Sequence, residues 1–185
     1  MLRAYAKYMR QGGTPFAQDY IEGALRNNVD ITRYLVRLFE ARLDPGRPDR
    51  NGGDIAHDSE GRNAKCADLE ERIVRALDDV SSLDHDRILR AYLAYVKATL
   101  RTNFFQLDPD GRPLERLSLK MDPSAIPELP EPRPKFEIFV YSPRVEGVHL
   151  RFGSVARGGL RWSDHRDDFR TEVLGLVKAQ MVKKP

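Results

Sequence analysis

The chain has 185 residues, 41% of them hydrophobic, so it can bury one ordinary core. Its 31 Lys and Arg and 28 Asp and Glu give a net charge of +3, but both signs are interleaved throughout, which disfavours nucleic-acid binding. The start, MLRAYAKYMRQ, does not resemble a signal peptide, no run reaches membrane-spanning length, and Cys66 is the only cysteine, so we expect a cytoplasmic chain without membrane segment, disulfide or metal site.

The first 43 residues predict three helices. Residues 2–10 are rich in helix formers. Thr14 and Pro15 suit the N-cap and first position of a second helix, and Asp30 can cap a third. In that third segment, ITRYLVRLFEARL, the apolar residues recur at the spacing of one helical face.

Residues 44–65 interrupt this pattern, because they contain almost no apolar side chain and many Gly, Pro, Asp and Arg. Such composition predicts a mobile surface loop. Helical periodicity returns over 67–80 and from 86 to about 103. The heptapeptide LRAYAKY at 2–8 recurs as LRAYLAY at 89–95, which we interpret as two amphipathic helices and not as a repeat architecture.

After residue 105 the pattern changes from helix to strand. Residues 106–133 are rich in proline and turn formers, contain one possible strand from Leu114 to Met121, and predict a connector. In KFEIFVY and GVHLRFG apolar residues alternate, and SPRVEG between them suits a hairpin. A helix is predicted from about Arg166. The expected fold class is therefore mixed, α+β or α/β, with a helical region at 1–105 followed by the beginning of an α/β unit at 134–185.

The loop ARGGLRWSDH at 156–165 has the composition of an anion-binding loop. Gly158 and Gly159 let a ligand approach the main chain, and Arg157 and Arg161 offer forked donors to a carboxylate or phosphate. The alternative is a Gly-Gly turn with solvated arginines, and the chain contains no GxGxxG or GxxxxGK[ST] pattern.

In the helix predicted after this loop, Lys178 and Lys183 lie on different faces. At about 100° per residue, Lys183 lies on the stripe of Phe169, Val173 and Leu176, whereas Lys178 lies about 180° away from Phe169. A lysine on an apolar stripe either extends to solvent near the helix end or is kept for a charged ligand. Lys178 is expected to be solvated.

The segment GVHLRFGSVARGGLRWSDHRDDFRTEVLGLVKAQMVKKP resembles the start of the catalytic region of the large bacterial NAD-dependent glutamate dehydrogenases. ILRAYLAYVKATLRTNFF resembles the helical segment that precedes it in those enzymes. The resemblance implies that residues 1–105 are part of a non-catalytic extension and that residues 134–185 open the substrate-binding domain. It also implies a substrate pair of L-glutamate and 2-oxoglutarate, NAD as cofactor, a role in amino-acid catabolism and a homo-oligomeric complete enzyme.

Site residues follow from the same resemblance. Lys183 matches a family lysine that binds near the substrate α-carboxylate, and Arg157 stands where the family usually has a lysine for the distal carboxylate. Gly158 and Gly159 match the family's backbone turn. The catalytic lysine, in a GAKGG stretch, and the NAD domain are expected beyond Pro185, so we expect an inactive fragment without catalytic residues or a cofactor site of its own. The alternative is a stand-alone helical interaction module without catalysis.

Overall fold

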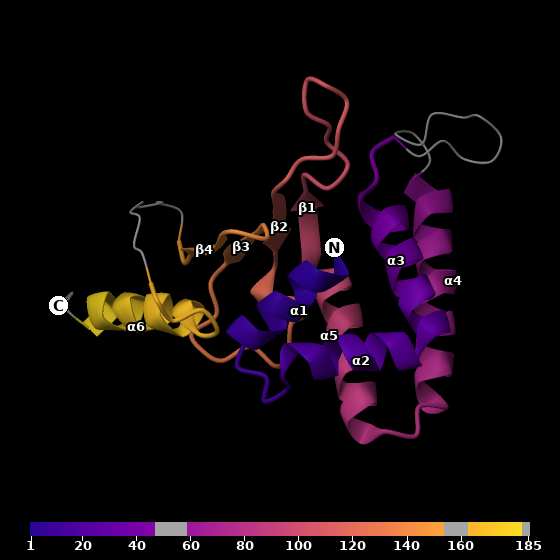
Figure 1. The fold of residues 1–185 in the computed structure, drawn as a ribbon, viewed down its shortest axis with the longest axis horizontal. Helices are drawn as coiled ribbons and strands as arrows, with labels where there is room; N and C mark the ends of the chain where they lie inside the picture. Colours follow the sequence, from indigo (N-terminus) through magenta and orange to yellow (C-terminus); the bar gives the residue numbers. More distant parts are fainter. Residues whose placement is uncertain (47–58, 154–162, 183–185) are drawn as a thin grey trace.

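The computed structural model describes residues 1–46, 59–153 and 163–182. The described residues form a helical region beside a four-stranded antiparallel sheet, with the last helix at one side of the molecule (Figure 1). The helices are α1 (Leu2–Gln11), α2 (Gln18–Asn27), α3 (Val29–Leu43), α4 (Ser59–Asp78), α5 (Leu83–Ala98) and α6 (Phe169–Val182). The predicted mixture of helices and strands is confirmed, and the described sheet makes the class α+β.

The first three helices are present, although two of the expected starts are wrong. α2 begins at Gln18 and not at Thr14 and Pro15, and Asp30 lies inside the first turn of α3, where Asn28 is the N-cap. Neither helix has a side-chain cap, so burial of the apolar face and not capping sets where these helices begin. The end of α1 has a clear cause, since Gly13 has φ +89°, a conformation that favours glycine.

α4 begins eight residues before its expected start at 67. Residues 59–65, which we expected to be loop, are helical, while residues 47–58 lie outside the described residues. α4 lies against α3 over its length (Figure 1). Its buried side includes Cys66 and Leu69, and Arg62 donates a hydrogen bond to the Asp44 carbonyl. The polar residues before Cys66 therefore form the solvent-facing start of a helix that α3 supports.

α5 starts with a side-chain cap and ends earlier than expected. The Ser82 hydroxyl accepts a hydrogen bond from the His85 backbone N–H at 3.3 Å, as an N-cap residue does. The helix stops at Ala98, and Thr99–Thr102 form strand β1, so the prediction of helix to about residue 103 is wrong. Thr99 is buried at this change of structure and shares a 2.6 Å hydrogen bond with the Tyr5 hydroxyl.

The two similar heptapeptides contribute to one aromatic cluster. Tyr5 and Tyr8 of α1 lie against Tyr95 of α5, with ring centroids 6.1 and 5.3 Å apart, and Tyr92 contacts Tyr5 at 6.4 Å. All four rings are buried. Burial raises the pKa of the Tyr5, Tyr92 and Tyr95 phenols, so they remain protonated and contribute packing, not charge.

The sheet has the strand order β1-β2-β3-β4 and joins all three predicted parts of the chain. β1 (Thr99–Thr102) pairs with β2 (Leu117–Met121), which pairs with β3 (Phe136–Tyr141), which pairs with β4 (Glu146–Arg151). The expected hairpin between the last two strands is confirmed. The division into an extension, a connector and a catalytic start remains a prediction.

Only one face of the sheet lies against the helical core. Leu119, Met121 and Phe139 are fully buried on that face, together with Glu137. Phe136, Ile138 and Val140 share the opposite face, as their alternation predicted, and they are only partly buried. A charged residue therefore occupies the buried face of β3, next to Phe139.

Candidate functional site: the docking of helix α6

The four residues predicted to bind substrate, namely Arg157, Gly158, Gly159 and Lys183, lie outside the described residues. The described residues stop at Gly153, before the predicted loop, and resume at Ser163, within the last three residues of that loop. Lys183 directly follows Val182, the last residue of α6. The structure therefore describes the supports of the predicted site: strand β4, the turn at 163–168 and helix α6.

The turn before α6 is tied to the helix by one hydroxyl. Ser163 Oγ donates to Glu172 Oε2 at 2.7 Å and accepts the backbone N–H of His165 at 3.1 Å. Glu172 lies in the first turn of α6, where a negative charge is favourable. The residues that leave the predicted loop are thereby held against the helix that leads to Lys183.

Gln11, the last residue of α1, holds the start of α6 with both ends of its amide. Its Nε2 group donates to the Arg166 carbonyl at 2.7 Å, and its Oε1 atom accepts the backbone N–H of Arg170 at 3.0 Å. The first N–H groups of a helix have no acceptor within the helix, so Gln11 acts as a cap from a distant element. Gln11 is only 2% exposed.

Arg170 extends from α6 into the core and pairs with Glu137 of β3. Its Nε and Nη2 groups donate to the two carboxylate oxygens at 2.7 and 2.9 Å, and both side chains are 0% exposed. Burial by itself would lower the pKa of the Arg170 guanidinium, but hydrogen bonding to the Glu137 carboxylate and its charge outweigh burial and raise the pKa. The guanidinium is therefore charged, and its two hydrogen bonds to Glu137 join α6 to the sheet.

Tyr8 completes the buried surroundings of this ion pair. Its ring lies 5.4 Å from that of Phe139, and burial, followed by the charge of Glu137, raises the phenol pKa well above its ordinary value. Outside the core, Arg10 adds an exposed ion pair to Asp167 at 2.7 Å. Neighbouring residues of α1 thus contact the beginning of α6 from the core to the surface.

The apolar stripe predicted for α6 is packed only in part: Phe169 is half-buried against the core, whereas Leu176 is 45% exposed. Among the helix residues whose side chains are described, 169–179, the buried ones are Arg170 and Leu174. Lys178 is exposed, as expected. The stripe on which Lys183 was placed by helical geometry is therefore half-buried at Phe169 and Val173 and exposed at Leu176.

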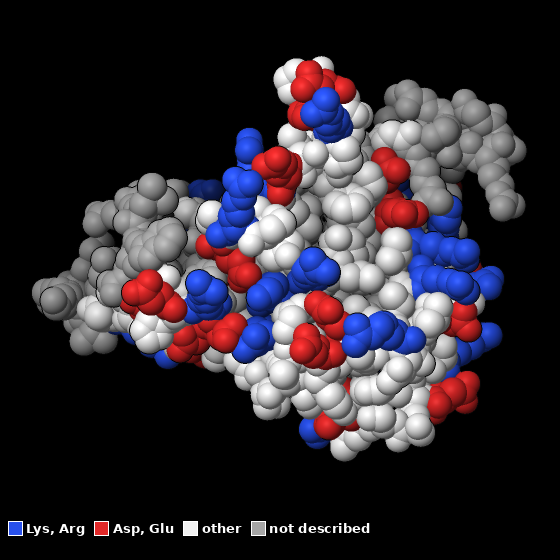
Figure 2. Space-filling model, viewed as in Figure 1, with Lys and Arg blue, Asp and Glu red and all other residues white. Residues whose placement is uncertain are grey.

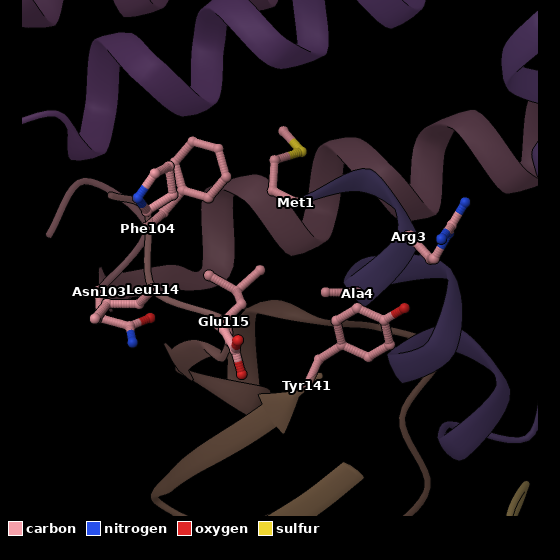
Figure 3. Close-up of a pocket in the computed structure, with 10 residues that line it drawn as sticks. Met1, Arg3, Ala4, Asn103, Phe104, Leu114, Glu115 and Tyr141 are labelled. Carbon is pink, nitrogen blue, oxygen red and sulfur yellow. The ribbon is translucent and has the colours of Figure 1, made fainter. Parts of the chain in front are cut away.

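A shallow pocket of about 310 Å³ lies at the other end of α1 (Figure 3). It is lined by Met1, by Arg3 of α1, by Phe104 and Glu115 from the connection between β1 and β2, and by Tyr141 at the end of β3. No described residue of α6 or of the turn at 163–168 lines it. It does not belong to the candidate site at α6.

Two other features are absent from the described ranges. These residues include no group of three or more His, Cys, Asp or Glu placed to hold a metal ion. No helix among them is long and apolar enough to cross a membrane. Lys, Arg, Asp and Glu alternate over the face in Figure 2, where charges of one sign do not dominate.

The described residues do not provide a site for a dinucleotide. Such sites use parallel strands joined through a helix, with a glycine-rich turn at the helix start, whereas the described strands are all antiparallel. The sequence also lacks the GxGxxG pattern. We therefore derive no step through NAD from this chain.

Sequence reasoning missed the three residues that fix α6: Gln11, Glu137 and Arg170. Glu137 gave the only local signal, as an acidic residue between Phe136 and Ile138 in a strand. Gln11 and Arg170 gave none, because their hydrogen bond joins positions 159 residues apart.

The described residues form an α+β segment in which a helical region supports α6, the helix that follows the predicted loop rich in glycine and arginine. A family model described as "Bacterial NAD-glutamate dehydrogenase, catalytic domain" matches residues 72–185, and one described as "Glutamate dehydrogenase, helical motif 3" matches residues 1–45. The chain belongs to the bacterial NAD-glutamate dehydrogenase family.

Similar proteins carry the same family name. The NAD-specific glutamate dehydrogenase of Pseudomonas aeruginosa is 57% identical over 183 residues, which cover 99% of this chain and 11% of that protein. That of Mycobacterium tuberculosis is 54% identical over 184 residues, with the same two coverages. That of Neurospora crassa is 36% identical over 147 residues, 79% of this chain and 13% of that protein. The chain thus spans about a tenth of the length of these relatives.

Proposed function

We propose that this chain is the part of an NAD-dependent glutamate dehydrogenase that joins the helical extension to the beginning of the substrate-binding domain. The reaction is the oxidative deamination of L-glutamate to 2-oxoglutarate and ammonia, a step of amino-acid catabolism. The observation that carries this proposal is the match of both family models along one chain, at 1–45 and 72–185. We also propose that the complete enzyme is a cytoplasmic homo-oligomer.

Within this reaction the chain contributes substrate binding. Lys183 pairs with the α-carboxylate of glutamate, Arg157 with the distal carboxylate, and Gly158 and Gly159 let the main chain approach the substrate. Two cations at a fixed separation orient a dicarboxylate and reject shorter ones. The described support for this role is the tie between the turn at 163–168 and α6, which holds the end of the loop against the helix that precedes Lys183.

We propose that other parts of the longer enzyme carry out the remaining chemistry. NAD, when bound, accepts the hydride from the substrate α-carbon. A lysine outside this sequence is proposed to activate water. By itself the chain is expected to have no dehydrogenase activity and no measurable affinity for NAD, which calorimetry with NAD can check.

A chimera tests the proposed function. The matching 183-residue stretch of the Pseudomonas aeruginosa relative is replaced by this sequence, and NADH formation from L-glutamate is followed. We expect turnover within about 10-fold of the parent protein, and much weaker turnover of L-aspartate, whose distal carboxylate is one methylene closer. A chimera that matches its parent in oligomeric state and thermal unfolding midpoint but does not oxidise glutamate would contradict the proposal.

A further inference from the structure

The start of α6 is fixed by two side chains that lie far apart in the sequence. Gln11, from the part of the chain that matches the helical-motif model, binds the backbone on both sides of the helix start. Arg170, from the part that matches the catalytic model, extends the other way to Glu137. The hydrogen bonds to the Arg170 N–H and to Glu137 are buried, so water competes little with them, while the bond to the Arg166 carbonyl is part-buried.

A small change in the tilt of α6 at its first turn produces a large displacement at its far end. α6 has 14 residues and is therefore about 20 Å long, with Lys183 as the next residue. A tilt of about 10° at the first turn would displace the far end by about 3 to 4 Å, given that length. A displacement of about 1 Å at a reacting group can reduce the rate of an enzyme 100-fold.

We infer that Gln11 and Arg170 are positioning residues for the substrate helix: through them the helical region sets the orientation of α6, the helix that precedes Lys183 in the sequence. This inference rests on the proposed function. We do not propose that either residue contacts the substrate. Gln11 acts through its two backbone contacts on α6, and Arg170 acts through Glu137 on the sheet.

The substitution Gln11→Met separates positioning from general stability. Methionine has a similar length but makes neither hydrogen bond. Thr99→Val is the matched control, because Thr99 is also buried and also hydrogen-bonds α1, through Tyr5, yet it does not contact α6.

The first measurement is amide hydrogen exchange on the 185-residue chain. Gln11→Met is expected to speed exchange of the α6 amides about 10-fold, while the α5 amides remain as protected as in the parent chain. Thr99→Val should leave α6 unchanged. Equal α6 exchange in Gln11→Met and the parent chain would overturn the claim that Gln11 holds the helix, and this result does not depend on any enzyme activity.

The second measurement uses the active chimera. Gln11→Met is expected to raise the KM for glutamate about 10-fold to 100-fold, with the KM for NAD unchanged. Thr99→Val should lower the thermal unfolding midpoint and leave both KM values unchanged. If Gln11→Met has the kinetic pattern of Thr99→Val, the positioning role is wrong. Inactivity of the unsubstituted chimera would count against the proposed function alone, and the exchange data would still decide whether Gln11 holds α6.

Discussion

Removing one member of the Glu137–Arg170 pair should destabilise the chain far more than removing both. The Glu137 carboxylate is 0% exposed. In Arg170→Met it would lose the guanidinium that faces it, together with two hydrogen bonds of 2.7 and 2.9 Å. Leaving a buried charge without its partner costs about 3 to 5 kcal/mol. Glu137→Met leaves the guanidinium in the same position, and we expect a loss of similar size.

The double variant Glu137→Met/Arg170→Met removes both charges and fills the site with apolar atoms. Replacement of a buried ion pair by apolar residues is often neutral or stabilising by about 1 to 4 kcal/mol. The contact between Gln11 and the Arg170 backbone N–H survives every one of these substitutions, since it does not involve the side chain of residue 170. The double variant should therefore be more stable than either single variant.

Urea unfolding followed by circular dichroism measures these free energies on the 185-residue chain. The exposed pair Arg90–Asp86, one helical turn apart with a 2.8 Å contact, is the control. Its single and double substitutions to methionine should each change the free energy of unfolding by about 0.5 kcal/mol or less. If the losses from Arg170→Met and Glu137→Met simply add in the double variant, the two side chains are not coupled as a buried pair.

Three further predictions concern the core, the thiol and one carboxyl group. Phe139→Ala should lower the free energy of unfolding by about 3 to 5 kcal/mol, measured by urea unfolding, because the ring is 0% exposed. Iodoacetamide should label Cys66 only as fast as the chain unfolds, because the thiol is buried and burial raises its pKa. Burial also raises the pKa of the Glu146 carboxyl, against the opposing charge of Lys7. Its folded form therefore favours the proton, so Glu146→Gln should stabilise the chain increasingly as the pH rises through the acid range above 4.5, and a thermal unfolding series that shows no such trend would contradict this sign.

Periodicity predicted most helices and the hairpin of β3 and β4, because a buried face repeats locally in the sequence. It did not predict the first turns of α4, where Arg62 and its polar neighbours cover a helix whose support comes from α3. It also extended α5 through Thr99, since the pairing partner of β1 lies some twenty residues further along the chain. Contacts between distant parts of the chain determine the secondary structure at such positions, and the local sequence pattern carries no information about those contacts.

The sequence predicted which residues could bind an anion, but not how the substrate helix is held. Helical geometry placed Phe169 and Leu176 on one stripe, but spacing alone did not show how deeply each side chain is buried. In the structure Phe169 packs partly against the core and Leu176 is 45% exposed, while Arg170 is fully buried because it pairs with Glu137. A buried ion pair between residues 33 positions apart has no signature in hydrophobic spacing.

The central claim, that this chain fixes the glutamate substrate through Lys183, is tested most directly by comparing two lysines of the active chimera. Lys183→Ala should raise the KM for glutamate and lower kcat/KM about 10-fold to 1,000-fold, the scale of losing a charge-assisted contact in a water-excluded site. Lys178→Ala should leave both constants within about twofold, because Lys178 is exposed. A larger loss from Lys178→Ala than from Lys183→Ala would contradict the account.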